Sequence, residues 1–180
     1  MCPVVEILLA ASILGIIASG ITRTAEQSGM VVSSPAFADS GAIPERYTCS
    51  GEDNSPPLNW AGIPSGAKAL VLMVDDPDAP SGTFTHWIVY NIDVDSSGLP
   101  ENVLKVAKPA VNYPQAVNGF GHNGYNGPCP PPGTPHHYHF RLYALSSALH
   151  LPGDATAKQL GAAMRGHILA VGELIGTFAR

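Results

Sequence analysis

The chain has 180 residues, of which 45% are hydrophobic and 13% are charged, and this is the composition of a folded protein with one sizeable core. Its net charge of -5 excludes an extended nucleic-acid surface, because no cluster of Lys and Arg is available to neutralise a run of phosphates. A pocket for a small anion stays compatible with this charge, since one local site can oppose the overall balance.

The N-terminal residues differ in character from the rest of the chain. Residues 7–21 are uncharged and apolar, a length that suits the hydrophobic region of a signal peptide better than a bilayer span. The segment before them contains Glu6 and no Lys or Arg, so an uncleaved membrane anchor is the alternative. We predict a signal peptide or membrane anchor at residues 1–22, a linker at 23–29 and a folded domain at 30–180. The domain is expected to be exported, either periplasmic or secreted.

Short apolar runs separated by Gly and Pro follow, and they predict strands more than helices. Residues 69–74 are continuously apolar, which is typical of a strand buried on both faces. A helix is predicted at residues 155–165, with Asp154 as its N-cap. The other predicted strands lie at residues 30–32, 84–92, 136–145 and 170–178. The pattern predicts a mainly β protein, an antiparallel β-sandwich with one or two short helices near the C-terminus.

The chain contains three cysteines. Cys2 lies in the predicted targeting segment and would be removed with it. Cys49 and Cys129 would then form an even pair in an oxidising compartment, where a disulfide persists. We predict that they are bridged, with two free thiols as the alternative.

Three carboxylates, Asp75, Asp76 and Asp78, end the first buried strand. The ordinary explanation is a turn, because Asp-Pro steps start turns, but carboxylates this close repel one another unless each has a partner. A short connection leads on to His86, so a hairpin is predicted to bring His86 near Asp76. Such a carboxylate would favour the protonated imidazole, a better partner for an anion. Strand alternation places His86 on the face opposite Trp87.

A third polar segment follows a stretch rich in proline, which stiffens the approach to the strand at 136–145. Alternation places His136 and Tyr138 on one face of this strand, where they form a pair of donors suited to a phosphate oxygen. His137 and His139 lie on the other face. They are a candidate metal pair, although two ligands without a third are weak evidence for a site.

These segments carry a resemblance to a known family, and the motifs are Tyr47-Thr48-Cys49, Ser55-Pro56-Pro57-Leu58-x-Trp60, Asp76-Pro77-Asp78-Ala79-Pro80, His86 in its strand, Gly127-Pro128-x-Pro130-Pro131 and His136-x-Tyr138. In order and spacing they resemble the phosphatidylethanolamine-binding protein family. The likeness is closest to the bacterial and archaeal branch, which is often called Raf-kinase-inhibitor-like. The resemblance extends over about residues 30–180.

The resemblance implies a β-sandwich with a small pocket that accepts phosphate, acetate or a phosphoethanolamine headgroup. Asp76 would orient His86 or meet a cationic amine of the ligand. No cofactor and no metal are implied. Animal members have an Arg where this chain has His137, so the name of kinase inhibitor transfers poorly. The residues implied to line the pocket are Asp76, Pro80, His86, Pro131, His136 and Tyr138.

The function predicted first is a non-catalytic binding protein for a small anionic ligand or phospholipid headgroup, with a partner protein as a further candidate. One alternative is a hydrolase with Asp76 and His86 as its acid/base pair, although no Gly-x-Ser-x-Gly elbow supplies a nucleophile. Another is a protease or kinase inhibitor-like protein that acts through a surface loop. No nucleic-acid partner is expected, and membrane contact is expected only through an uncleaved N-terminal segment.

Overall fold

The structure is a computed structural model that describes residues 29–106 and 113–180. The predicted signal peptide or anchor and almost all of the predicted linker therefore lie outside the described residues. In the described ranges, no helix is long and apolar enough to cross a membrane.

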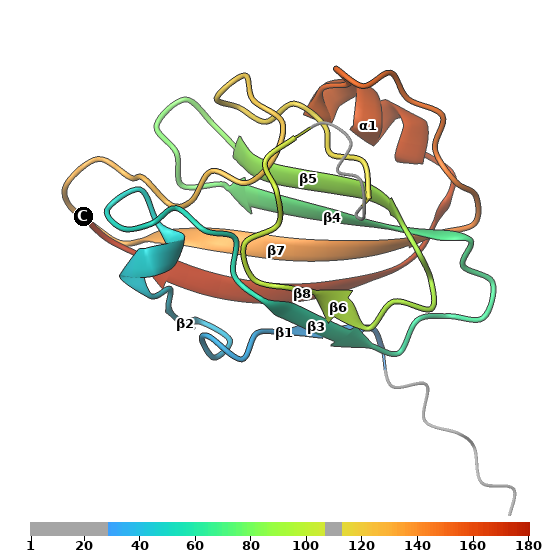
Figure 1. Ribbon diagram of the computed structural model, residues 1–180, viewed down its shortest axis with the longest axis horizontal. Coiled ribbons are helices and arrows are strands. Elements are labelled where there is room, and N and C mark those ends of the chain that lie inside the picture. The colour runs from blue at the N-terminus through green and yellow to red at the C-terminus, as the bar shows by residue number, and fades with distance from the viewer. Residues whose placement is uncertain (1–28, 107–112) are drawn as a thin grey trace, which may run out of the picture.

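Two β-sheets form the body of the domain (Figure 1). All neighbouring strands are antiparallel except β2 and β8, which are parallel. The larger sheet has the order β2 (Gly41–Ala42), β8 (Ile168–Phe178), β7 (His136–Leu145), β4 (Ala69–Asp76) and β5 (Phe84–Ile92). The smaller has the order β1 (Val31–Ser33), β3 (Leu58–Ala61) and β6 (Gly98–Leu99). The prediction of a mainly β sandwich is confirmed.

The main hydrophobic core lies between the two sheets. Val32 and Trp60 of the smaller sheet pack in one cluster with Leu72, Trp87 and Phe140 of the larger sheet. Full burial of side chains of this size contributes about 1.5–3 kcal/mol each. The strands predicted at 84–92 and 136–145 match β5 and β7, because dense aromatic and β-branched residues suit a half-buried pleated surface.

A second core covers the opposite face of the larger sheet, where α1 (Ala157–Met164) lies against β4 and β5 (Figure 1). This helix buries Leu160 and Met164 in a cluster that includes Ile88 of β5. The predicted N-cap Asp154 is wrong. The cap is Thr156, because its hydroxyl accepts from the backbone of Gln159 while the Gln159 side chain returns to the backbone of Thr156, a reciprocal capping box. A short 3-10 helix, η1 (Glu45–Tyr47), precedes β3.

A β-bulge in β5 changes the faces that simple alternation assigns. Trp87 pairs with Val74 of β4, but the next residue of β4 pairs with Thr85, which leaves His86 as an extra residue in the ladder. The ring of His86 packs against Tyr138. Tyr138 belongs to the core cluster that also contains Trp87. The prediction that His86 lies on the face opposite Trp87 is therefore wrong, since the bulge turns the start of β5 towards the space between the sheets.

Candidate functional site

A cavity of about 200 Å³ opens at the end of the larger sheet where β4 stops and β5 and β7 begin. Five of the six residues expected from the sequence line it, and the sixth, Tyr138, is fully buried against the ring of His86. The structure therefore brings the six together, whereas ligand binding at them stays a prediction. The lining residues are Asp76, Ala79, Pro80, Ser81, Phe84, His86, Phe120, Cys129, Pro130, Pro131 and His136.

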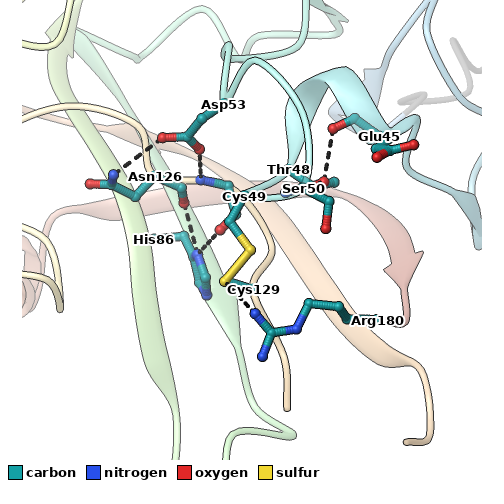
Figure 2. Close-up of a disulfide and its surroundings, with 10 residues drawn as sticks. Glu45, Thr48, Cys49, Ser50, Asp53, His86, Asn126, Cys129 and Arg180 are labelled. Atoms are coloured by element: carbon teal, nitrogen blue, oxygen red, sulfur yellow. Dashed lines mark hydrogen bonds between the residues drawn. A yellow bond between two sulfur atoms is a disulfide. The ribbon is translucent and has the colours of Figure 1, made fainter. Parts of the chain in front are cut away.

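The imidazole of His86 is held by backbone carbonyls. Its Nδ1 lies 2.8 Å from the carbonyl oxygen of Asn126 and 3.1 Å from that of Gly127 (Figure 2). A carbonyl oxygen only accepts, so Nδ1 carries the hydrogen and donates it. Burial lowers the pKa of His86 below its ordinary value, and it outweighs the opposing effects of these carbonyls and of Asp76. The carboxylate of Asp76 does raise the pKa of His86, as predicted, but burial lowers this pKa by more.

Asp76 pairs with His136 rather than with His86. The Oδ2 atom of Asp76 lies 2.7 Å from Nδ1 of His136, and both side chains are almost fully buried. Its Oδ1 atom accepts the backbone N–H of Asp78 at 2.8 Å. The predicted hairpin does bring His86 to the cavity that Asp76 lines. The neighbouring strand β7 supplies the closer imidazole, however, so the hydrogen bond of Asp76 goes to His136 and not to His86.

The hydroxyl of Tyr138 makes no well-formed hydrogen bond among the described residues, although the side chain is fully buried and the carboxylate of Asp76 and the backbone of Cys129 lie close to it. Burial is the main cause that raises the pKa of this phenol far above its usual range, and the nearby carboxylate of Asp76 raises it further. The phenol therefore stays protonated at physiological pH. A buried hydroxyl without a well-formed hydrogen bond costs about 1–3 kcal/mol. Tyr138 packs against the ring of His86 behind the cavity wall and does not itself line the cavity.

Each of the other two carboxylates has a partner of its own. Asp75 accepts the Thr85 hydroxyl at 2.7 Å on the opposite face of the sheet, and burial is the main cause that raises its pKa. Asp78 accepts from both the backbone and the side chain of His137, and this side-chain bond is the main cause that lowers the pKa of Asp78. The three carboxylates thus avoid mutual repulsion by facing in different directions.

The two histidines considered as a metal pair also diverge. His137 bonds to Asp78, whereas His139 bonds to Glu173 of β8 at 2.8 Å. Within residues 29–106 and 113–180, no group of three His, Cys, Asp or Glu side chains is placed to hold a metal ion.

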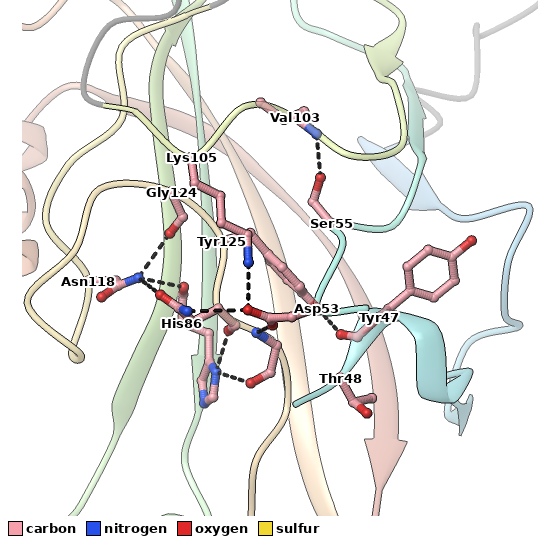
Figure 3. A network of polar contacts seen from close by, with 12 residues as sticks. Tyr47, Thr48, Asp53, Ser55, His86, Val103, Lys105, Asn118, Gly124 and Tyr125 are labelled. Carbon is pink, nitrogen blue, oxygen red and sulfur yellow. Dashed lines mark hydrogen bonds and ion pairs between the residues drawn. The ribbon is translucent and has the colours of Figure 1, made fainter. Parts of the chain in front are cut away.

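A polar network behind the cavity positions the carbonyls that hold His86 (Figure 3). Asp53 accepts the backbone N–H of Gly127 at 2.6 Å and the side-chain amide of Asn126 at 3.3 Å. Asn118 donates to the side chain of Asn126 at 2.8 Å. Gly127 suits this place because a Cβ there would collide with a backbone carbonyl of the neighbouring loop.

A disulfide joins Cys49 to Cys129, with 5.4 Å between their Cα atoms (Figure 2). Cys129 also lines the cavity. Beside this bond, the backbone N–H of Cys49 donates to the carbonyl of Pro128 at 3.1 Å. The loop that bears Asp53 is in this way tied to the proline-rich wall of the cavity.

The residues that sequence reasoning missed are mostly apolar. The ring of Phe120 meets those of Phe84 and His86 edge to face, with centroids 4.8 and 5.5 Å apart. Gly119 permits this contact, because a Cβ there would come within 2.6 Å of the Phe84 ring. The only sequence signal for this wall is an isolated aromatic residue inside the long Gly- and Asn-rich loop, which predicted a functional loop but no particular residue.

The chain is similar in sequence to proteins of one family. Residues 33–179 match the family model described as phosphatidylethanolamine-binding protein. A UPF0098 protein of Methanothermobacter thermautotrophicus is 49% identical over 151 residues, which are 84% of this chain and 99% of that protein. A Mycobacterium tuberculosis protein named "Putative lipoprotein LppC" is 41% identical over 150 residues, which are 83% of this chain and 72% of that protein.

Two solved structures are also similar. CT736 of Chlamydia trachomatis, described as a homolog of phosphatidylethanolamine-binding protein, is 40% identical with a TM-score of 0.76, and the match covers 84% of this chain and 98% of CT736. YbcL of E. coli is 27% identical with a TM-score of 0.79, over 85% of this chain and 99% of YbcL. With a family model that spans most of its length and relatives close to half identical, this chain belongs to the phosphatidylethanolamine-binding protein family.

Proposed function

We propose that the protein binds a small anion, of the phosphate or phosphoethanolamine type, in the cavity beside His86 and His136, without catalysing a reaction. The observation that carries this proposal is the fully buried hydroxyl of Tyr138, which makes no well-formed hydrogen bond among the described residues. A ligand oxygen that accepts from this hydroxyl would remove the cost of leaving it unpaired. The aromatic wall at Phe84 and Phe120 would exclude water and strengthen the bond.

Asp76 gives the pocket a second kind of recognition. Its carboxylate is already bonded to His136 and to a backbone N–H, so the negative charge is largely satisfied before a ligand arrives. A zwitterion such as phosphoethanolamine would place its phosphate towards the imidazoles and its ammonium towards Asp76. Binding of free phosphoethanolamine, a phosphomonoester, is thus a natural extension of anion binding in this pocket.

A hydrolase that uses Asp76 and His86 as a pair has less support. Asp76 bonds to His136, so the proposed acid and base are not coupled. Ser81 lines the cavity, but among the described residues its side chain makes no hydrogen bond to either imidazole. An activated serine requires such a contact, so binding remains the function that the geometry supports best.

Export is part of the proposal. Disulfides persist mainly in oxidising compartments, and Cys49 is bonded to Cys129. One relative has the name "Putative lipoprotein LppC". A periplasmic or secreted location, with an N-terminal membrane anchor as the alternative, agrees with both observations.

Calorimetric titration of the protein with phosphate and with phosphoethanolamine at pH 6 tests the function. We expect saturable binding that weakens at least tenfold in His86→Ala and in His136→Ala, because one charge-assisted hydrogen bond is worth about 1.5–3 kcal/mol. His137→Ala is the matched control, since His137 is exposed and bonds to Asp78 outside the cavity. If the folded wild-type protein binds neither ligand, the anion-binding function is refuted.

A further inference from the structure

We propose that the pocket selects the protonated form of its anion, a phosphate that still carries one P–OH, so that each bound ligand brings one proton into the complex. This inference rests on the proposed anion-binding function and names its substrate class. The class is the phosphomonoester, or hydrogen phosphate, in contrast to the phosphodiester. The geometry of His86 is the origin of the selectivity.

The two carbonyls that bond to His86 determine which ring nitrogen carries the hydrogen, and so whether the other nitrogen is a donor or an acceptor towards a ligand. Nδ1 donates to the oxygens of Asn126 and Gly127, so the neutral ring has its lone pair on Nε2. Figure 2 shows Nε2 on the side of the ring away from these carbonyls. Neutral His86 therefore offers a ligand an acceptor and no donor.

The contacts that fix these two carbonyls make it unfavourable for the ring of His86 to change to its other tautomer. Asp53 holds Gly127 by its backbone N–H and Asn126 by its side chain, and the nearby disulfide ties the same loop to Cys49. Moving the hydrogen from Nδ1 to Nε2 would place a lone pair against two carbonyl oxygens. Nε2 can thus become a donor only if the ring takes a second proton.

The groups packed around His86 do not favour that second proton at neutral pH. Asp76 and Asp75 of β4 attract it, as do the two carbonyls, but burial is the largest effect and the pKa of His86 is lowered. From β7, Tyr138 packs against the ring and stays neutral. His136 faces the same cavity, with its Nδ1 committed to Asp76.

A fully deprotonated tetrahedral anion would therefore set an oxygen against the lone pair of Nε2. Asp76 offers no relief, because a carboxylate only accepts hydrogen bonds and has no hydrogen to donate to the anion. A phosphate with one P–OH donates that hydrogen to Nε2 of His86 and accepts from the hydroxyl of Tyr138. The alternative microstate, a protonated ring with a dianion, contains the same number of protons, so both give one proton per complex.

Methyl phosphate and dimethyl phosphate are suitable probes, because neither contains an amine that could act as donor. The second pKa of a phosphomonoester is about 6, whereas the diester has no further proton to lose in this range. We expect the Kd of methyl phosphate to rise roughly tenfold per pH unit between pH 7 and pH 8, with about one proton taken up at pH 8. Proton uptake is measured by calorimetry in two buffers of different ionisation enthalpy. Dimethyl phosphate and sulfate should bind at least tenfold more weakly than methyl phosphate at pH 6.

Substitutions assign the proton to its residue. His86→Gln should flatten the pH dependence, because an amide N–H donates to the dianion at any pH. His136→Gln should weaken binding, and His137→Gln should change neither the affinity nor its pH dependence. A pH-independent Kd in wild-type protein, no proton uptake, or dimethyl phosphate binding as tightly as methyl phosphate overturns the inference. Failure of phosphoethanolamine as well as methyl phosphate at pH 6 would refute the proposed function itself.

Discussion

Replacing Tyr138 by Phe is expected to stabilise the ligand-free protein while weakening the binding of phosphate. The hydroxyl is fully buried and makes no well-formed hydrogen bond among the described residues. Leaving such a group unpaired costs about 1–3 kcal/mol. Allowing for the small void left behind, we expect a gain of about 1 kcal/mol, which raises the Tm by roughly 2–4 °C in a domain of this size.

A matched control is available in the same core. Tyr125 is also fully buried, but its hydroxyl donates to the backbone carbonyl of Tyr47 at 2.7 Å. Tyr125→Phe removes the same atom and leaves that carbonyl without its donor, so it should lower the free energy of unfolding by about 1–3 kcal/mol. The two substitutions delete identical atoms, and we predict that they change the free energy of unfolding in opposite directions.

Urea unfolding followed by far-UV circular dichroism gives both free energies, and calorimetric titration with phosphate gives the affinity. We expect Tyr138→Phe to be the more stable protein and to bind phosphate at least tenfold more weakly, because a bond to a charged ligand is worth about 1.5–3 kcal/mol. If Tyr138→Phe is destabilised as much as Tyr125→Phe, the hydroxyl has a partner in the free protein. Tyr138 would then have no unused donor to offer a ligand.

Three further predictions concern the disulfide, the helix cap and pH. Reducing the bond between Cys49 and Cys129, which are 80 residues apart, should cost about 4–5 kcal/mol in urea unfolding, and a Cys49→Ser/Cys129→Ser protein should show no added effect of reductant. Thr156→Ala should cost about 1 kcal/mol of thermal stability while Asp154→Ala costs almost none; equal losses would contradict the capping box. Because the folded-state pKa of His86 is lowered, its contribution to stability is present above the unfolded pKa near 6.5 and is lost as the pH falls towards the folded value. Wild-type protein should therefore lose more stability than His86→Gln between pH 7 and pH 5, and parallel curves would contradict this.

Local pattern was sufficient to predict the strands and part of the site. Apolar and aromatic density located β4, β5 and β7 to within two residues, because burial on a pleated sheet selects those residue types. Alternation correctly placed His136 and Tyr138 on the buried face of β7. The likeness of the motifs to a known family identified the six residues that the fold gathers at one cavity.

Pairing across strands required the tertiary structure. Asp76 and His136 are 60 residues apart and meet because β4 lies between β5 and β7, with His139 opposite Asp75 in the ladder. The hairpin predicted from the sequence correctly brings His86 near Asp76, but a hairpin involves only the strand that follows and so could not indicate His136. The bulge at His86 has the same origin, since its register depends on the whole sheet.

Residue patterns along the chain were thus enough for the class of fold, the main strands and the polar residues at strand ends. Tertiary structure alone decided the partner of each carboxylate, the face of His86, the aromatic wall at Phe120 and the unpaired state of the Tyr138 hydroxyl. Local propensities act over a few residues along the chain, whereas hydrogen-bond partners and burial depend on residues that become neighbours only when the sheets assemble.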